Sequence, residues 1–178
     1  MTLLGIDSRL LYTGLVAAVA AARLVELRIA RVNLERLLAR GGVEAGAGHY
    51  PAMVALHALW LLACPAEVWL LDRPFVPPLA AAMLVLLAAA MALRYWAIAS
   101  LGGLGGRWTT RIVVLPGAPL IETGPYRLLR HPNYLAVVVE ILALPLVHTA
   151  WITAIVASAA NAMILAVRIR AEEAALRR

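Results

Sequence analysis

The sequence predicts an all-α fold, an integral membrane helical bundle of about five transmembrane helices, and three observations indicate this class. Hydrophobic residues make up 63% of the 178 residues, the mean hydropathy is +0.85, and only 15% of the residues are charged. A soluble domain is only about half apolar. Several apolar stretches approach the ~20 residues that a helix needs to cross a bilayer. No Pro/Gly/Ser-rich linker divides the chain, so residues 1–178 are interpreted as one membrane domain.

Five apolar stretches account for the predicted helices. They are Leu10 to Ile29, Met53 to Leu71, Leu79 to Leu101, Tyr134 to Val147 extended by its flanks, and Trp151 to Val167. The fourth stretch is the shortest, because Pro132 starts it and Pro145 interrupts it. We expect the fourth and fifth stretches to form a C-terminal helical hairpin.

All basic residues are arginines, and their distribution predicts an orientation. When the ends of five spans alternate between the two sides of a membrane, only Arg9 and Arg73 of the 16 arginines lie apart from the others. The positive-inside rule then places the N-terminus outside and the C-terminus with the long polar loops in the cytoplasm, for which we expect a bacterial inner membrane. The arginines are not interleaved with aromatic residues on a polar face, so we expect contacts with membrane lipids and no nucleic acid.

The first candidate binding segment is a polar loop that leads directly into the fourth apolar stretch. Its sequence is Gly124-Pro125-Tyr126-Arg127-Leu128-Leu129-Arg130-His131-Pro132-Asn133-Tyr134. Pro132 fits the first turn of a helix, whose free N–H groups favour an anionic ligand group. Tyr126, His131 and Tyr134 offer aromatic surfaces and hydrogen-bonding groups of the kind that hold a nucleoside. The alternative is an aromatic and basic belt at the membrane surface.

The second candidate segment ends the fifth apolar stretch. Helical spacing places Asn161, Arg168 and Glu172 on one face, with Glu173 beside them. This face would carry polar groups from inside the membrane to its cytoplasmic edge. Arg168 and Glu172 could equally form an ordinary surface pair at i,i+4.

Other polar residues within the apolar stretches also need an explanation, because an ionisable group in a span costs several kcal/mol unless it is paired or faces a cavity. We expect Glu26 to pair with nearby Arg23. His57 is interpreted as an interhelical hydrogen-bonding residue or a ligand contact, and Glu140 as lining a pocket or pairing between helices. Arg94 lies near the end of the third stretch.

Four glycines in Gly102-Gly103-Leu104-Gly105-Gly106 precede Trp108 in the loop after the third stretch. Glycine at this density permits a close approach of backbone to a ligand, or only a flexible turn. The single cysteine, Cys64, excludes an intrachain disulfide and a cysteine-based metal cluster, and we expect no metal.

In combination, the two candidate segments resemble a known family. The order of Gly-Pro-Tyr-Arg, Arg-His-Pro-x-Tyr, an apolar hairpin and Arg-x-x-x-Glu-Glu-x-x-Leu, from about Arg94 to Leu176, is similar to the isoprenylcysteine carboxyl methyltransferases and their bacterial relatives. The segment from Arg23 to Pro51 looks like the bacterial branch. Members of this branch are associated with type III polyketide synthases and methylate long-chain alkylpyrones. The resemblance implies S-adenosylmethionine as cofactor, an amphipathic lipid-like acceptor, and a type III polyketide synthase as partner.

The resemblance also implies roles for individual residues. Those expected to bind the cofactor are Tyr126, His131, Pro132, Tyr134 and Glu173. Arg168 and Glu172 are the expected catalytic residues, with Arg168 holding the acceptor oxygen. Candidate contacts to the acceptor are His57, Arg94, Trp108 and Asn161. The family commonly has glycine where this chain has Ala136.

Three other functions remain open. A prenylated cysteine carboxylate or a phospholipid amine could replace the alkylpyrone, although Arg168 would repel an amine. A sterol-type membrane reductase would use NADPH, and a lipid-binding protein would need no cofactor. For the methyltransferase we expect a cytoplasmic pocket that is closed by the glycine-rich loop and the tail. A lateral opening between helices would admit the lipid chain.

Overall fold

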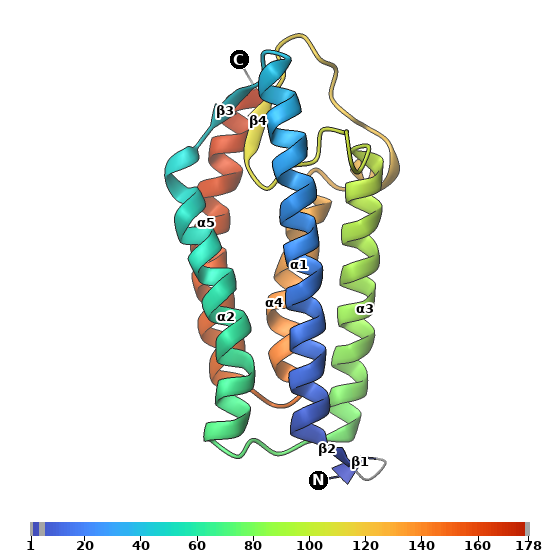
Figure 1. Ribbon diagram of the computed structural model, residues 1–178, viewed down its shortest axis with the longest axis vertical. Helices are drawn as coiled ribbons and strands as arrows, with labels where there is room; N and C mark the ends of the chain where they lie inside the picture. The colour runs from blue at the N-terminus through green and yellow to red at the C-terminus, as the bar shows by residue number, and fades with distance from the viewer. Residues whose placement is uncertain (1, 4–5, 177–178) are drawn as a thin grey trace.

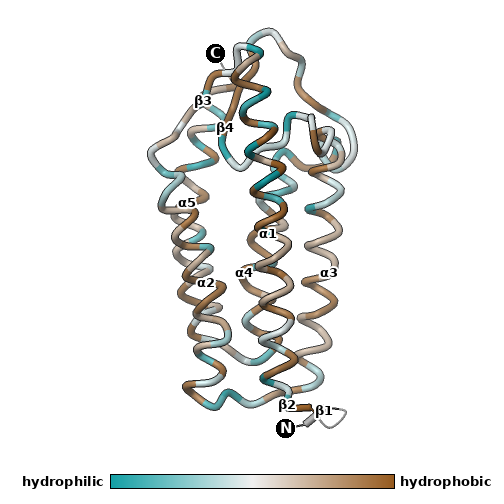
Figure 2. Tube along the Cα trace, viewed as in Figure 1, coloured by the Kyte–Doolittle hydropathy of each residue, from teal (hydrophilic) through white to brown (hydrophobic). Residues whose placement is uncertain are grey.

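The computed structural model describes residues 2–3 and 6–176, and its helices run roughly parallel to the long axis of the molecule (Figure 1). The α-helices are α1 (Ser8–Ala39), α2 (Tyr50–Leu70), α3 (Pro77–Ser100), α4 (Pro132–Leu146) and α5 (Trp151–Leu176). Apolar residues cover the middle of the helices, and hydrophilic residues gather toward both ends (Figure 2). The predicted fold class, an all-α membrane bundle, is confirmed.

Four of these helices are long and apolar enough to cross a membrane, and α4 is the exception. It has 15 residues, which corresponds to about 22 Å against a hydrocarbon core of about 30 Å. Pro132 begins α4 as predicted. Pro145 does not interrupt the helix but lies in its last turn, which ends at Leu146.

Helix α1 is longer than the apolar run predicts, because its polar continuation is also helical. The 32 residues give a length of about 48 Å. Asp7 caps its start by accepting a hydrogen bond from the backbone N–H of Arg9. At its end, Gly41 has a φ of 84° and the N–H of Gly42 donates to the carbonyl of Leu37. This is a Schellman motif, in which glycine adopts the left-handed conformation that stops a helix.

Two short antiparallel strand pairs, which the sequence did not predict, supplement the bundle. One joins β1 (Thr2–Leu3) to β2 (Ile6–Asp7), and the other joins β3 (Val43–Ala45) to β4 (Ile112–Val114). The second pair ties the α1–α2 connection to the α3–α4 connection, and both of its strands contact α5. It therefore holds the loop before Ile112 close to the C-terminal part of α5.

The glycine-rich loop is fastened to α1 by a buried amide. Asn33 donates from Nδ2 to the carbonyls of Gly103 and Trp108 at 2.7 and 2.8 Å, and its Oδ1 accepts from the N–H of Gly105 at 2.7 Å. Gly105 has a φ of 88°, a left-handed backbone conformation that favours glycine. The Trp108 side chain packs against Ala30 of α1. These contacts favour the turn over the ligand-approach interpretation of the glycines.

A buried charge network joins α1, α3 and α4. Arg23 pairs with Glu26, as predicted, and also with Glu140 at 3.0 Å. Arg94 lies 3.4 Å from Glu140 and 3.7 Å from Glu26, and it donates to Asn133 Oδ1 at 3.1 Å. Glu140 thus has interhelical partners, which was one of the two open interpretations. Two arginines and two glutamates balance each other's charge within the apolar bundle.

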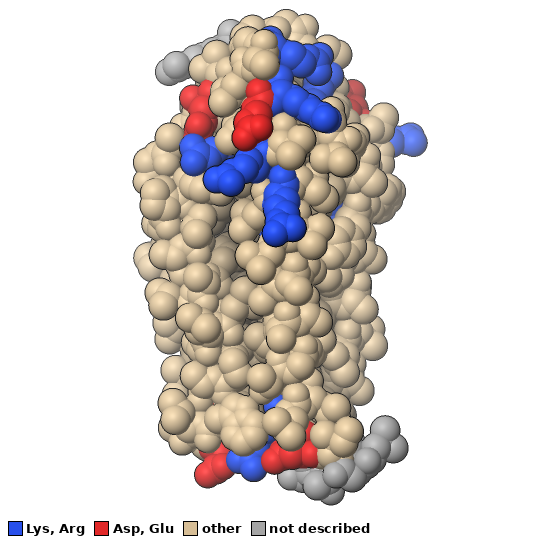
Figure 3. Space-filling view, viewed as in Figure 1, with Lys and Arg blue, Asp and Glu red and all other residues tan. Residues whose placement is uncertain are grey.

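The arginines are concentrated at the end of the molecule that carries the C-terminus (Figure 3). We call this the arginine-rich end, and its arginines are Arg28, Arg31, Arg36, Arg40, Arg107, Arg111, Arg127, Arg130, Arg168 and Arg170. Arg177 and Arg178, which the sequence analysis assigned to the same side, lie outside the described residues. Arg9 and Arg73 lie at the opposite end, beside Asp72 and Glu67 respectively.

Candidate functional site

The two segments singled out in the sequence meet at the arginine-rich end. Tyr134, in the first turn of α4, donates a hydrogen bond from its hydroxyl to Glu172 of α5. The same hydroxyl accepts one from Nε of Arg168 at 2.9 Å. Arg168 is only 6% exposed, and its guanidinium also lies 5.5 Å from the centre of the Tyr134 ring. The start of α4 and the end of α5 are therefore joined through one phenol.

His131 completes this cluster from the residue that precedes α4. Its ring stacks on Tyr134, with the ring centres 5.2 Å apart and the planes inclined by 17°. Its Nδ1 lies 3.8 Å from Glu172 Oε2, and its Nε2 lies 3.8 Å from Glu173 Oε1. His131 and Glu173 thus face each other, although 42 positions apart in the sequence. We call His131, Tyr134, Arg168, Glu172 and Glu173 the polar cluster.

Tyr126 lies near this cluster in the 3-10 helix η2 (Gly124–Arg127). Burial raises the pKa of Tyr126 to about 12, and the negative charge of Glu172 acts in the same direction. The phenol therefore keeps its proton at neutral pH and can donate a hydrogen bond. Pro132 is buried at the first position of α4, where its missing N–H costs no helical hydrogen bond.

Arg168 has two further partners that the sequence analysis missed. Its NH2 group donates to the backbone carbonyl of Thr110 at 2.7 Å, and its NH1 group lies 3.3 Å from the sulfur of Met53 in α2. Every residue has a backbone carbonyl, so the sequence cannot indicate which carbonyl Arg168 binds. Methionine is common in apolar helices and gives no signal either. Only the approach of the loop to α5, set by the β3–β4 pair, brings Thr110 within reach.

Two predicted site residues lie apart from the polar cluster and serve the packing of the bundle. Arg94 is buried in the charge network, although its bond to Asn133 reaches the start of α4. Trp108 is buried against α1.

The remaining two predicted site residues, Asn161 and His57, lie within helices α5 and α2. Asn161 is buried two helical turns before Arg168, about 10 Å along α5. His57 uses Nδ1 to contact the carbonyl of Met53 in its own helix, at 2.8 Å. The hydrogen bond of His57 Nδ1 therefore lies within α2 and does not join two helices.

The side chains of the polar cluster fit S-adenosylmethionine, the cofactor that the family resemblance implies. The stacked His131 and Tyr134 rings present aromatic surface, on which an adenine can pack. Side chains of Glu172 and Glu173 are 29% and 38% exposed, so their carboxylates can accept hydrogen bonds from hydroxyl or amino groups of a ligand. The start of α4 bears no acidic residue, which suits an anionic ligand group.

A groove adjoins this cluster on the side of α1. It has a volume of about 470 Å³ and is lined by Leu24, Leu27, Arg28, Ala30, Arg31 and Leu34 of α1, Tyr50 of α2, and Thr109, Thr110 and Arg111. We call it the α1 groove. Thr110 belongs to both places, since it lines the groove and accepts a hydrogen bond from Arg168.

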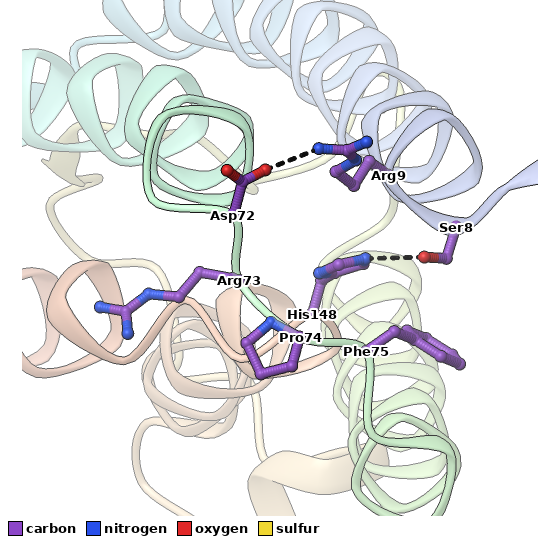
Figure 4. A pocket seen from close by; sticks show the side chains of 7 residues that line it. All are labelled: Ser8, Arg9, Asp72, Arg73, Pro74, Phe75 and His148. Atoms are coloured by element: carbon purple, nitrogen blue, oxygen red, sulfur yellow. Dashed lines mark hydrogen bonds and ion pairs between the residues drawn. The ribbon is translucent and has the colours of Figure 1, made fainter. Parts of the chain in front are cut away.

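A second pocket, of about 380 Å³, lies at the opposite end of the bundle (Figure 4). Ser8 and His148 form a hydrogen bond of 3.1 Å there, and Arg9 pairs with Asp72 at 2.9 Å. Arg73 lines the same pocket and pairs with Glu67. None of the residues predicted to bind cofactor or acceptor lines this pocket.

Comparisons with known proteins bear on both halves of the chain. The model of the isoprenylcysteine carboxyl methyltransferase family matches residues 82–178, which include every residue of the polar cluster. A Bacillus subtilis protein described as uncharacterized protein YpbQ is 40% identical over 163 residues, covering 91% of this chain and 94% of the relative. A Haemophilus influenzae protein described as uncharacterized is 28% identical over 161 residues, covering 90% and 91%.

Proposed function

Because the chain belongs to the isoprenylcysteine carboxyl methyltransferase family, whose members are membrane methyltransferases, we propose that it transfers a methyl group from S-adenosylmethionine to an oxygen of a lipid-like acceptor. The observation that carries this proposal is the convergence of His131, Tyr134, Arg168 and Glu172 at the arginine-rich end. Aromatic, acidic and cationic groups there suit a charged nucleoside on one side and an acceptor oxygen on the other.

The cofactor binds in this proposal at the start of α4. His131 and Tyr134 would contact the adenine, and Glu172 and Glu173 would accept hydrogen bonds from the ribose hydroxyl groups or the amino groups of the cofactor. When bound, S-adenosylmethionine supplies an electrophilic methyl group carried on a sulfonium. The carboxylates of Glu172 and Glu173 would also favour the positive charge of the cofactor, because charge interactions strengthen where water is partly excluded.

Arg168 orients the acceptor in this proposal. The enol of a hydroxypyrone is a vinylogous acid, and its oxygen, like that of a carboxyl group, is largely anionic near neutral pH, so no strong general base is needed. A guanidinium can hold such an oxygen in line with the methyl group, and alignment of this kind contributes up to ~7–11 kcal/mol in favourable cases. Tyr134 keeps Arg168 and Glu172 at a fixed spacing, because its hydroxyl bonds to both.

The acceptor that we favour is a long-chain alkylpyrone or a related polyketide enol, made by a type III polyketide synthase. The guanidinium of Arg168 suits an anionic oxygen and disfavours a phospholipid amine. A prenylated cysteine carboxylate offers the same kind of oxygen and is the second candidate. We place the reaction at the cytoplasmic face, since the positive-inside rule assigns the arginine-rich end to the cytoplasm and a charged cofactor must enter from water.

The test uses purified protein in neutral detergent. Binding of S-adenosylmethionine and of NADPH is measured by calorimetry, and labelled methyl transfer is then followed with alkylpyrones, alkylresorcinols and prenylcysteines. We expect binding of the sulfonium cofactor and transfer to an anionic oxygen acceptor. Binding of NADPH alone would instead indicate a reductase, and binding of neither with no transfer would reject the enzyme.

A further inference from the structure

The α1 groove combines an apolar wall with a cationic rim. Leu24 and Leu27 are 63% and 40% exposed on the face of α1 that also carries Arg28 and Arg31. These positions follow one helical face, at spacings of three and four residues. A volume of about 470 Å³ falls within the range of small-molecule sites, about 300–1,000 Å³.

Only one of the three arginines that line the groove has a carboxylate partner among the described residues. Arg111 pairs with Glu44 at 2.8 Å and lies 4.5 Å from the centre of the Tyr50 ring. Among the described residues, Arg28 and Arg31 form no ion pair with a carboxylate. Two guanidinium groups beside exposed leucines thus favour a ligand with an anionic head and an apolar tail.

The groove and the polar cluster share one wall. Thr110 lines the groove, its hydroxyl lies 3.2 Å from the Tyr50 hydroxyl, and its carbonyl accepts the hydrogen bond from Arg168. Arg168 therefore stands between the groove and the stacked rings of His131 and Tyr134. A ligand in the groove is separated from Arg168 only by the Thr110 segment.

We propose that the α1 groove binds the methyl acceptor, and that the acceptor is an anionic amphiphile with a single alkyl chain. Its chain lies along Leu24 and Leu27, and its head is held by Arg28 and Arg31, beside the Thr110 segment that contacts Arg168. This inference rests on the proposed function and deepens it. The α1 residues and Tyr50 lie outside residues 82–178, so acceptor choice is assigned to the part of the chain that the family model does not cover.

The continuity with Arg168 is the reason to favour the acceptor over a membrane phospholipid. A phospholipid headgroup would satisfy Arg28 and Arg31 equally well by charge. A phospholipid would however bring two acyl chains to a groove of limited volume. Its binding would also not explain why the groove shares Thr110 with the partners of Arg168.

The test is photolabelling of the full chain in neutral detergent with a long-chain fatty acid that carries a diazirine in its alkyl chain. We expect mass spectrometry to find the label on residues 24–34 and near Tyr50. An excess of unlabelled fatty acid should abolish this labelling, whereas an excess of the fatty acid methyl ester or of phosphatidylglycerol should not. The Arg28→Gln/Arg31→Gln double variant should label about tenfold less, as expected for the loss of charge-assisted hydrogen bonds.

Arg40→Gln is the matched control, because Arg40 is an exposed arginine at the same end of α1 that does not line the groove. It should label like the wild type. Label spread evenly over the lipid-facing helices, equal loss in the control, or equal competition by phosphatidylglycerol would each overturn the inference.

The outcome is separable from that of the proposed function. Specific labelling of the groove without any methyl transfer would support an amphiphile-binding site in the α1 groove and reject the proposed methyltransferase activity. Methyl transfer with an unchanged KM for the acceptor in the double variant would support the methyltransferase activity and reject the α1 groove as the acceptor site.

Discussion

Tyr134 links three of its neighbours through a single side chain. Its hydroxyl bonds to Arg168 and Glu172, one face of its ring stacks on His131, and the Arg168 guanidinium lies near the ring. Both hydrogen bonds involve a charged partner, and bonds of this type contribute about 1.5–3 kcal/mol each. Loss of the hydroxyl should therefore release Arg168 and Glu172 while leaving the stacked rings in place.

Tyr134→Phe tests this arrangement. We expect kcat/KM for methyl transfer to fall about 10- to 100-fold, because Arg168, which holds the acceptor in our proposal, loses its fixed position. Tyr95→Phe on α3 serves as control, since Tyr95 is exposed and outside the cluster. Initial rates with labelled cofactor provide the measurement. Equal rates for Tyr134→Phe and wild type would show that the hydroxyl does not position the site.

Arg168→Lys separates the charge of this residue from its geometry. Arg168 uses three nitrogens at once, toward Tyr134, Met53 and Thr110, and an ammonium group cannot reproduce that fork. We expect the KM for the acceptor to rise at least about tenfold while the Kd for S-adenosylmethionine stays unchanged. Arg170→Lys, at an exposed neighbouring position, is the control. A weaker cofactor affinity with an unchanged acceptor KM would assign Arg168 to the cofactor instead.

At the scale of elements, the buried charge network fixes α1, α3 and α4 beneath the polar cluster. Arg94 extends it to Asn133 in the first turn of α4, next to the residues that bind the cofactor in our proposal. Removing one partner of such a network leaves an uncompensated buried charge, which costs about 3–5 kcal/mol.

Glu140→Gln should therefore lower the free energy of unfolding by about 3–5 kcal/mol, since Arg23 and Arg94 both lose a carboxylate partner. Unfolding in mixed detergent, followed by circular dichroism, measures the change. Glu35→Gln, at an exposed position of α1, is the matched control and should have a small effect. A small loss for Glu140→Gln as well would mean that the network does not hold the three helices.

Four of the helices could be predicted because their apolar runs approach the thickness of a bilayer, and α4 because Pro132 marks its start. The β3–β4 pair could not, since three-residue strands carry no usable periodicity and Val43 pairs with Val114 far along the chain. Helical spacing predicted that Arg168 and Glu172 share a face. The partners of Arg94 and the role of Asn33 depend on long-range packing, which no local pattern encodes.

At the scale of the whole molecule, the two ends of the bundle differ in chemistry. The end opposite the polar cluster is closed by His148, which is 1% exposed and bonds to Ser8. Burial lowers the pKa of His148 below its usual 6.5. The unfolded chain takes up this proton at a higher pH than the folded chain does. The stabilising contribution is thus fully present above pH 6.5 and is lost as the pH falls below it.

His148→Gln tests this linkage. We expect the thermal midpoint of the wild type to drop between about pH 7.5 and about pH 5.5, and the variant to show a smaller drop. The variant should also be less stable at the higher pH, by about 1–3 kcal/mol, because a buried hydrogen bond is disturbed. Parallel pH profiles for both proteins would place the titrating group elsewhere.

The shortness of α4 has a consequence for the surrounding lipid. With its Leu146 end level with one surface, its His131 end would lie about 8 Å inside a bilayer of ordinary thickness. The lipid must thin locally around that end, or water must fill the depression, and the mismatch costs a fraction of a kcal/mol per Å. Turnover in nanodiscs should then be faster with 14-carbon than with 22-carbon acyl chains, because a thinner bilayer brings its headgroup layer level with the polar cluster, where methyl transfer takes place in our proposal.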